Sequence, residues 1–128
     1  MRILLDTCSF LWSVSEPERL SSSARKALLD PGNDVFLSAV SAWEISVKEQ
    51  LGTLVLADPS STFIPKYRAL HGFAELALDE TAVLQLSKLP LIHKDPFDRM
   101  LICQAIALGM AIATPDPVIA RYPVQLIW

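Results

Sequence analysis

Short apolar runs alternate along the chain with longer segments in which apolar side chains recur every three or four positions. Short continuous apolar runs are typical of strands buried on both faces, and the longer periodicity is typical of helices. The runs predict strands at residues 2–6, 35–37, 73–78, 110–114 and 124–127. The periodic segments predict a helical turn at 7–13 and helices at 22–29, 39–51, 60–71, 80–88, 96–109 and 117–121.

Residues that begin and end helices stand at the predicted boundaries. Ser38 is a suitable N-cap for the helix that Gly52 ends, because its side chain can accept a hydrogen bond from a free backbone N–H. Asp95 caps the clearest helix, which has Pro96 at its first position and Gly109 at its end. Strands that alternate with helices in this way predict an α/β domain with a mostly parallel central sheet.

Composition and length indicate a single compact domain over residues 1–128, because the chain has no repeat, low-complexity tract or linker. An apolar content of 52% with 20% charged residues is typical of a globular protein. No apolar run approaches the roughly 20 residues of a membrane-spanning helix. The apolar start is too short for a secretory signal, so we expect a soluble, cytoplasmic protein. The four glycines form no phosphate-binding loop.

The net charge of −3 does not favour nucleic-acid binding over a broad basic surface. Any such contact would be local. An ordinary solvated surface is the better interpretation of the basic residues that could provide it, which are Lys48, Lys66, Arg68, Lys94 and Arg99.

Four acidic residues stand beside or inside strongly apolar segments: Asp6, Glu44, Asp98 and Asp116. Asp6 and Asp116 follow predicted strands, and Glu44 lies on the helix after another strand. Because parallel strands end at the same edge of a sheet, the topology alone brings these three acids together. Clustered buried carboxylates repel one another unless a cation neutralises them. A hard divalent ion with oxygen ligands, Mg²⁺ or Mn²⁺, is the simplest explanation.

Glu44 and Asp98 also have ordinary structural interpretations. Glu44 could form a helix-stabilising pair with Lys48, four residues later. Asp98 could be an acid that suits the first turn of its helix, although that helix is apolar nearly all round. A helical wheel puts Glu44 on an apolar face, which favours function; its neighbours there are Val40, Trp43, Val47 and Leu51.

The other acids differ in how well structure alone explains them. Asp116 lies in a Pro-rich turn that an aspartate would suit, so turn chemistry and function are equally favoured. Asp6 could cap a turn and has little other structural explanation. Asp95 is fully explained as a helix cap, and we interpret it as structural.

The remaining chemically distinctive residues have structural interpretations. The two cysteines, Cys8 and Cys103, stand in apolar surroundings and are interpreted as small buried hydrophobes. His71 and His93 have no partner at catalytic spacing and are interpreted as surface or loop residues. The tryptophans are interpreted as core or subunit contacts; they are Trp12, Trp43 and Trp128.

Taken together, four segments resemble the PIN domain, and within it the VapC-like toxins of prokaryotic toxin–antitoxin pairs. They are Leu4-Leu5-Asp6-Thr7, Ser41-Ala42-Trp43-Glu44-Ile45 with Lys48, His93-Lys94-Asp95-Pro96-Phe97-Asp98-Arg99, and Thr114-Pro115-Asp116 with Ala120-Arg121-Tyr122-Pro123. Each segment alone is weakly specific. Their order and spacing over the whole chain make the resemblance specific.

The resemblance implies a three-layer α/β/α sandwich and a metal-dependent ribonuclease. Asp6 and Asp98 would be the principal ligands of Mg²⁺ or Mn²⁺, and Glu44 and Asp116 would complete the catalytic site directly or through water. The family also implies a homodimer and a small antitoxin whose tail covers the acidic cleft. Cys8 departs from the commonest pattern, and we expect it to touch none of these ligands.

The resulting hypothesis is hydrolysis of RNA phosphodiester bonds by an endoribonuclease, the toxin of a toxin–antitoxin pair. Three alternatives stay open. The first is a PIN-type nuclease of RNA processing that is not a toxin. The second is a phosphoryl-accepting signalling domain, although Asp6 has no second acid beside it and no lysine follows the strand at 110–114. The third is a non-catalytic binding module on the same fold.

Overall fold

Five strands form one parallel sheet in the computed structural model, which describes residues 1–128. The order across the sheet is β3-β2-β1-β4-β5, and every neighbouring pair is parallel. The prediction of a mostly parallel sheet is therefore confirmed. The strands are β1 (Arg2–Leu5), β2 (Asp34–Ser38), β3 (Ala74–Leu76), β4 (Ala111–Ala113) and β5 (Leu126–Ile127).

The predicted helices form, except that the segment expected at 117–121 makes only a three-residue 3-10 turn and the one expected at 80–88 ends as a 3-10 helix. The expected helical turn after β1 is a complete helix of nine residues. No helix combines the length and apolarity needed to cross a lipid bilayer. The α-helices are α1 (Thr7–Ser15), α2 (Ser22–Leu29), α3 (Ala39–Gln50), α4 (Ser60–Leu70), α5 (Glu80–Leu84) and α6 (Pro96–Leu108). Three short 3-10 helices are η1 (Pro17–Arg19), η2 (Gln85–Lys88) and η3 (Ile119–Arg121).

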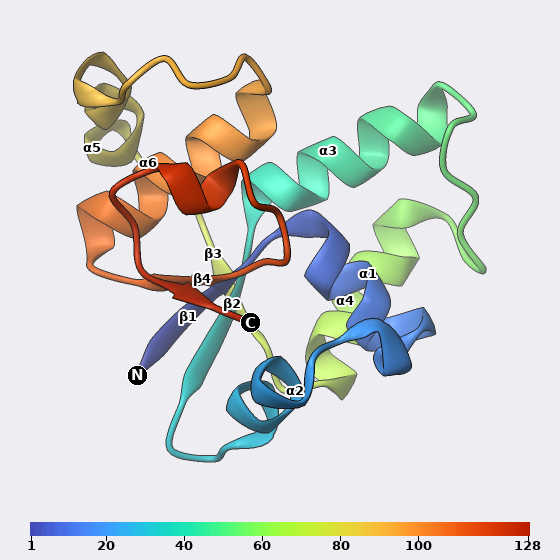
Figure 1. Cartoon of the computed structure of the whole chain (residues 1–128). Helices are drawn as coiled ribbons and strands as arrows, with labels where there is room; N and C mark the ends of the chain where they lie inside the picture. Colours follow the sequence, from blue (N-terminus) through green and yellow to red (C-terminus); the bar gives the residue numbers. More distant parts are fainter.

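The alternating side chains of β1 separate two apolar cores, one on each face of the sheet. Leu4 packs in the core that contains α6 and η3, through residues such as Ile102. Ile3 and Leu5 point to the other face, where Phe10 of α1 is fully buried. Helices therefore cover both faces, with α6 on one side and α1, α2 and α4 on the other (Figure 1). This arrangement confirms the three-layer α/β/α sandwich.

Helix α3 begins at the carboxyl end of β2 and contributes to both cores. Val40 belongs to the α6 side and Ile45 to the α1 side, so the helix lies across the carboxyl edge of the sheet (Figure 1). The predicted N-cap is confirmed, because Ser38 Oγ accepts a hydrogen bond from Val40 N at 3.0 Å. This placement puts one side of α3 directly over the ends of the strands.

The helical wheel of α3 was right that Val40 is buried on the side of Glu44 and wrong that Trp43 and Leu51 are. Trp43 is 56% exposed and Leu51 is 71% exposed, whereas Ser41 and Glu44 are buried. The helix turns its polar line at 41 and 44 toward the sheet edge because that edge is itself polar. Trp43 instead packs edge-on against Phe97 at the start of α6, with ring centroids 4.7 Å apart.

A buried glutamine connects three elements near the same edge. Gln104 of α6 is fully buried, its Oε1 accepts a hydrogen bond from Ser38 Oγ, and its Nε2 donates to the Ala77 carbonyl at 3.2 Å. The amide thus links the end of β2, the start of α3 and the segment after β3. Both of its polar ends are satisfied, as a buried amide requires.

Replacement of Gln104 by alanine leaves the Ser38 hydroxyl and the Ala77 carbonyl without this partner, so we expect a loss of about 1–3 kcal/mol in the free energy of unfolding. Urea denaturation followed by circular dichroism measures it. The matched control is Gln50→Ala on the exposed end of α3, for which we expect a change within about 0.5 kcal/mol. Equal effects of the two substitutions would contradict the role given to Gln104.

Candidate active site

Asp6 is the residue that ends β1 and caps α1. Its Oδ1 accepts a hydrogen bond from Ser9 N at 2.8 Å, and the residue is only 5% exposed. Burial raises the pKa of this carboxyl above its ordinary value, and the hydrogen bonds from Ser9 and Cys8 oppose the shift without cancelling it. A carboxylate is therefore held at the sheet edge in surroundings that disfavour its charge.

Glu44 is buried and still pairs with Lys48, so both interpretations of this residue apply. Its Oε1 accepts a hydrogen bond from Thr7 Oγ1 at 2.7 Å, and its Oε2 lies 2.5 Å from Lys48 Nζ. The Glu44 side chain is 7% exposed, whereas that of Lys48 is 48% exposed. The lysine thus reaches in from solvent to neutralise a carboxylate inside the molecule, and the hydrogen bond raises the pKa of Lys48.

Asp98 lies in the first turn of α6, behind the cap formed by Asp95. As predicted, Asp95 Oδ1 accepts hydrogen bonds from Phe97 N at 2.9 Å and Asp98 N at 3.0 Å. Burial first, and then the negative charges of Asp95, Glu44 and Asp116, raise the pKa of Asp98 to about 6. A hydrogen bond with His93, 3.3 Å from Nε2 to Oδ2, acts in the opposite direction.

Asp116 makes the turn contacts that an aspartate in a Pro-rich loop would make. Its Oδ1 accepts a hydrogen bond from Val118 N at 2.9 Å, and its own N–H donates to Thr114 Oγ1 at 3.1 Å. The turn interpretation is therefore confirmed. A role in chemistry stays a prediction for this residue.

Sheet topology and electrostatics place the four acids in one neighbourhood. Leu5 of β1 pairs with Ala113 of β4, so the segments carrying Asp6 and Asp116 leave the sheet side by side. Burial first, then the charge of Asp6, which Cys8 contacts, and to a smaller extent the charge of Asp116 raise the pKa of Cys8 to about 12. Thr7, the residue after Asp6, donates a hydrogen bond to Glu44. The negative charge of Glu44 in turn contributes to the raised pKa of Asp98. The expectation that distant acids gather at the carboxyl edge is met in this sense.

The acids do not, however, form a ready-made metal cage. No three histidine, cysteine, aspartate or glutamate side chains are placed to hold one ion together. Each acid instead has its own partner: Ser9 for Asp6, Lys48 for Glu44, His93 for Asp98 and Val118 for Asp116. The donors are hard carboxylate oxygens with incompletely compensated charge, which suits Mg²⁺ or Mn²⁺. Binding would require some of these contacts to exchange for the ion.

Two expectations about neighbouring residues were wrong. Cys8 is not a buried hydrophobe remote from the acids, because its Sγ lies 3.4 Å and 3.5 Å from the two Asp6 carboxylate oxygens. Position 8 falls on the first turn of α1, which Asp6 caps, so its side chain returns toward the cap. His93 does lie in a loop, as expected, but it has partners there, because it contacts Asp98 and Tyr122. Cys103 is buried as expected.

Most of the basic residues considered for nucleic-acid contact are occupied elsewhere. Lys66 pairs with Asp58 and Arg68 with Glu75. Arg99 is 9% exposed and donates inward to Tyr122. The interpretation of these charges as an ordinary surface is therefore confirmed for the two surface pairs, and Arg99 is structural.

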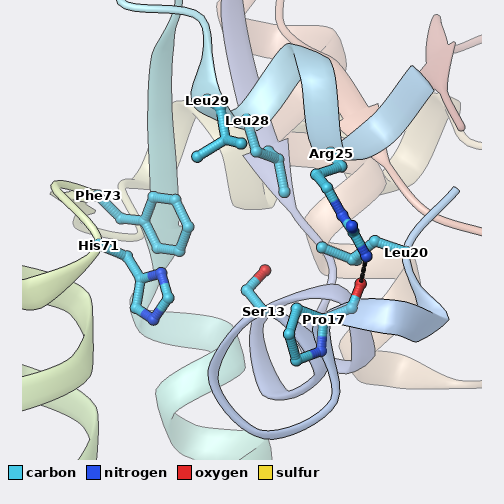
Figure 2. A pocket seen from close by; sticks show the side chains of 8 residues that line it. All are labelled: Ser13, Pro17, Leu20, Arg25, Leu28, Leu29, His71 and Phe73. Atoms are coloured by element: carbon cyan, nitrogen blue, oxygen red, sulfur yellow. Dashed lines mark hydrogen bonds between the residues drawn. The ribbon is translucent and has the colours of Figure 1, made fainter. Parts of the chain in front are cut away.

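A separate hollow of about 250 Å³ lies away from the acids (Figure 2). Its only hydroxyl, on Ser13, donates to the Ser9 carbonyl, and its Arg25 guanidinium donates to the Pro17 carbonyl. No hydrogen bond joins the Ser13 hydroxyl to the His71 ring, the remaining polar side chain of the hollow. The residues that line it are Ser13, Pro17, Leu20, Arg25, Leu28, Leu29, His71 and Phe73.

The fold and the acidic edge define a class of protein, and comparison with known families gives the same one. Residues 3–125 match the family described as the PIN domain. The chain therefore belongs to the PIN domain family, which confirms the resemblance found in the sequence.

Individual proteins and solved structures resemble the chain to different extents. The chain is 34% identical over 58 residues to Ribonuclease VapC16 of Mycobacterium tuberculosis, a stretch that covers 45% of this chain and 41% of that protein. The match thus spans less than half of the relative. The crystal structure of VapBC2 from Rickettsia felis, bound to a promoter DNA fragment, superposes with a TM-score of 0.75 at 13% identity, covering 98% of this chain and 97% of that one. DNA-bound VapBC from Salmonella typhimurium gives a TM-score of 0.71 at 14% identity, covering 98% and 96%. At these identities the structures confirm the fold.

The raised pKa of Asp98 predicts a pH-dependent penalty on the folded state in a metal chelator. The pKa of Asp98 is about 6 in the folded state against an ordinary 3.8. Below about pH 3.8 the carboxyl is protonated in both the folded and unfolded states and the penalty is absent, whereas above about pH 6 it is ionised in both and the penalty is complete. Asp98→Asn should therefore unfold like the wild type near pH 4 and be more stable at pH 7.5, by on the order of 1–3 kcal/mol. Denaturant titrations at the two pH values measure this. Asp34→Asn, on the exposed start of β2, is the matched control, and a pH-independent difference for Asp98→Asn would contradict the prediction.

Proposed function

We propose that this chain is a divalent-metal-dependent endoribonuclease and the toxin of a toxin–antitoxin pair. Asp6, Glu44, Asp98 and Asp116 would form its catalytic and metal-binding site, with Mg²⁺ or Mn²⁺ as the cofactor. The observation that carries the proposal is the PIN domain match over residues 3–125 in a chain whose four acids share one edge of the sheet. The name of the relative Ribonuclease VapC16 supports RNA as the substrate.

When bound, a divalent cation would lower the pKa of a water molecule and offset the charge that develops on the scissile phosphate. Asp6 and Asp98 would hold it, because the pKa of each is raised by burial and each carboxylate lacks a full counter-charge. Glu44 is oriented by the Thr7 hydroxyl, which fixes one of its oxygens toward the first residue of α1. Asp116 would complete the set directly or through water. Hydrolysis of this kind leaves 5′-phosphate and 3′-hydroxyl ends.

Lys48 would have a second role in the same site. Its ammonium group neutralises Glu44 in the structure described above, and nearly half of its side chain is exposed. If a cation compensated Glu44, Lys48 would be free to contact an RNA phosphate beside the site. No histidine is needed as a general base, and His93 is engaged with Asp98 and Tyr122.

We further propose a homodimer and a small antitoxin as partners. Exposed apolar side chains support such contacts; they include Val55 at 91%, Leu91 at 76% and Leu84 at 63% exposure. The VapBC structures from Rickettsia felis and Salmonella typhimurium support a toxin–antitoxin assignment through their shared fold. An antitoxin gene beside the coding sequence would add independent support.

A non-catalytic binding module is the second candidate, and one observation favours it. The acids are each engaged by a protein partner, and no three of them are arranged around a common ion position. A protein that keeps this arrangement in the presence of metal would bind without cleaving. A PIN-type nuclease of RNA processing shares the proposed chemistry and differs only in its target.

Cleavage assays separate these candidates. Several structured and unstructured RNAs are incubated with the protein in Mg²⁺ or Mn²⁺ and with a chelator, and products are resolved on denaturing gels. We expect internal cleavage by the wild type, none in chelator, and at least about a hundredfold slower cleavage by Asp98→Asn, because a ligand of the ion is lost. Asp34→Asn, at the opposite end of the strands, should cleave like the wild type.

Two outcomes would contradict the proposal. Cleavage that survives the chelator, or that Asp98→Asn retains, would remove the acidic edge from the mechanism. Absence of cleavage together with absence of Mn²⁺ binding in a calorimetric titration would favour the binding module.

A further inference from the structure

A short chain of hydrogen bonds runs from the interior of the protein to Asp98. Tyr122, after η3, is 4% exposed, and its hydroxyl oxygen lies close to three groups of other segments. These groups are His93 Nδ1 at 2.6 Å, Arg99 Nη1 at 3.0 Å and the His93 backbone N at 3.1 Å. On the other side of the imidazole ring, His93 Nε2 lies 3.3 Å from Asp98 Oδ2.

The donors and acceptors around the Tyr122 hydroxyl determine the tautomer of His93. A guanidinium and a backbone N–H can only donate, so Arg99 and the His93 backbone use both lone pairs of the hydroxyl oxygen. The hydroxyl hydrogen is then left for His93 Nδ1, which must be the unprotonated acceptor. The ring proton of neutral His93 therefore resides on Nε2 and is directed at Asp98 Oδ2. The Asp98 contact is thus a hydrogen bond with a defined donor.

The same residues fix the position of the ring. Arg99 Nη1 also donates to the Pro90 carbonyl at 2.9 Å and approaches the His93 carbonyl at 3.3 Å. The segment before α6 is therefore attached to the second turn of that helix, and the His93 ring packs edge-on against Tyr122 with centroids 5.3 Å apart. A histidine held at its backbone and at Nδ1, and packed against the Tyr122 ring, has little freedom to turn away from Asp98.

We propose that His93 is a positioning residue of the acidic site, which sets the orientation of the Asp98 carboxylate through Nε2–H. This inference rests on the proposed function. The bond occupies Oδ2, while Oδ1 accepts no hydrogen bond and is left to face a cation. Ligating carboxylates are commonly oriented by a hydrogen bond to the oxygen that does not bind the ion, and loss of such a partner typically weakens metal affinity about 10–100-fold. Tyr122 and Arg99 act one step further back, by fixing the tautomer.

The tautomer can be measured without any metal or substrate. The chain contains only two histidines, so a ¹⁵N-correlated proton spectrum of the tag-free protein shows two imidazole rings, and His71→Gln assigns them. At about pH 8.5, above the ordinary histidine pKa of about 6.5, we expect His93 to have a pyrrole-type Nε2 and a pyridine-type Nδ1. Tyr122→Phe, which removes only the hydroxyl, should shift His93 toward a mixture. A wild-type ring protonated at Nδ1 would overturn the proposal.

Metal affinity tests the positioning role with matched variants. His93→Gln keeps an amide donor near the Nε2 position, whereas His93→Asn places its amide near Nδ1 and loses the donor toward Asp98. We expect the Mn²⁺ dissociation constant, measured by electron paramagnetic resonance without RNA, to rise about 10–100-fold in His93→Asn and only a few-fold in His93→Gln. His71→Asn is the control, with wild-type affinity. Thermal unfolding of each variant confirms that it is folded.

The outcomes distinguish this inference from the function on which it rests. Equal Mn²⁺ affinity in the wild type and His93→Asn, with loss in Asp98→Asn, would overturn the role of His93 and leave the metal site intact. Absence of Mn²⁺ binding by the wild type would overturn the site itself and the role of His93 with it. Equal losses in His93→Gln and His93→Asn would show that the ring acts only by filling space, which also overturns the proposal.

Discussion

Repulsion among carboxylates at a single edge of the sheet is the constraint around which this molecule is built. Burial and the charges of three neighbouring acids raise the pKa of Asp98, and burial alone raises that of Asp6. A charge arrangement of this kind does not favour folding, so the stability must come from elsewhere. It comes from the two apolar cores on either side of β1, which do not involve the acids. The carboxyl edge of the sheet can carry unfavourable charge because the apolar side chains buried on the two sheet faces stabilise the fold.

The partners of the acids show how the fold limits this repulsion. The carboxylates accept hydrogen bonds from different residues and from different kinds of donor. Asp6 has a backbone N–H, Glu44 has a hydroxyl and an ammonium group, and Asp98 has an imidazole. Helix α3 is central to the arrangement, because its position across the carboxyl ends brings Glu44 over β1. The contact of Trp43 with Phe97 joins the same helix to the start of α6. The acids are therefore close enough to interact and are still separately satisfied.

Sequence reasoning was most successful where the determinant is local. Strands and helix caps depend on a few adjacent residues, so Ser38 and Asp95 were identified as caps from the chain alone, and both accept the expected backbone hydrogen bonds. The convergence of the acids followed from one topological rule about parallel strands. Trp43 and Leu51 were wrongly assigned to the buried face of α3 because apolar periodicity assumes an apolar neighbour, and here the neighbour is a polar edge. The contact of His93 with Tyr122 joins residues 29 positions apart and has no periodic signature.

The pair formed by Lys48 and Glu44 bears on the order in which the protein folds and binds a metal ion. A lysine on the same helix, four residues away, is available to the glutamate as soon as α3 forms. The polypeptide thus carries its own counter-ion and can reach its native state before any metal arrives. An ion that bound Glu44 afterwards would have to displace this tethered ammonium group. Occupancy of the acidic site by metal would then depend on the free concentration of the ion. Folding and metal binding would be separate steps.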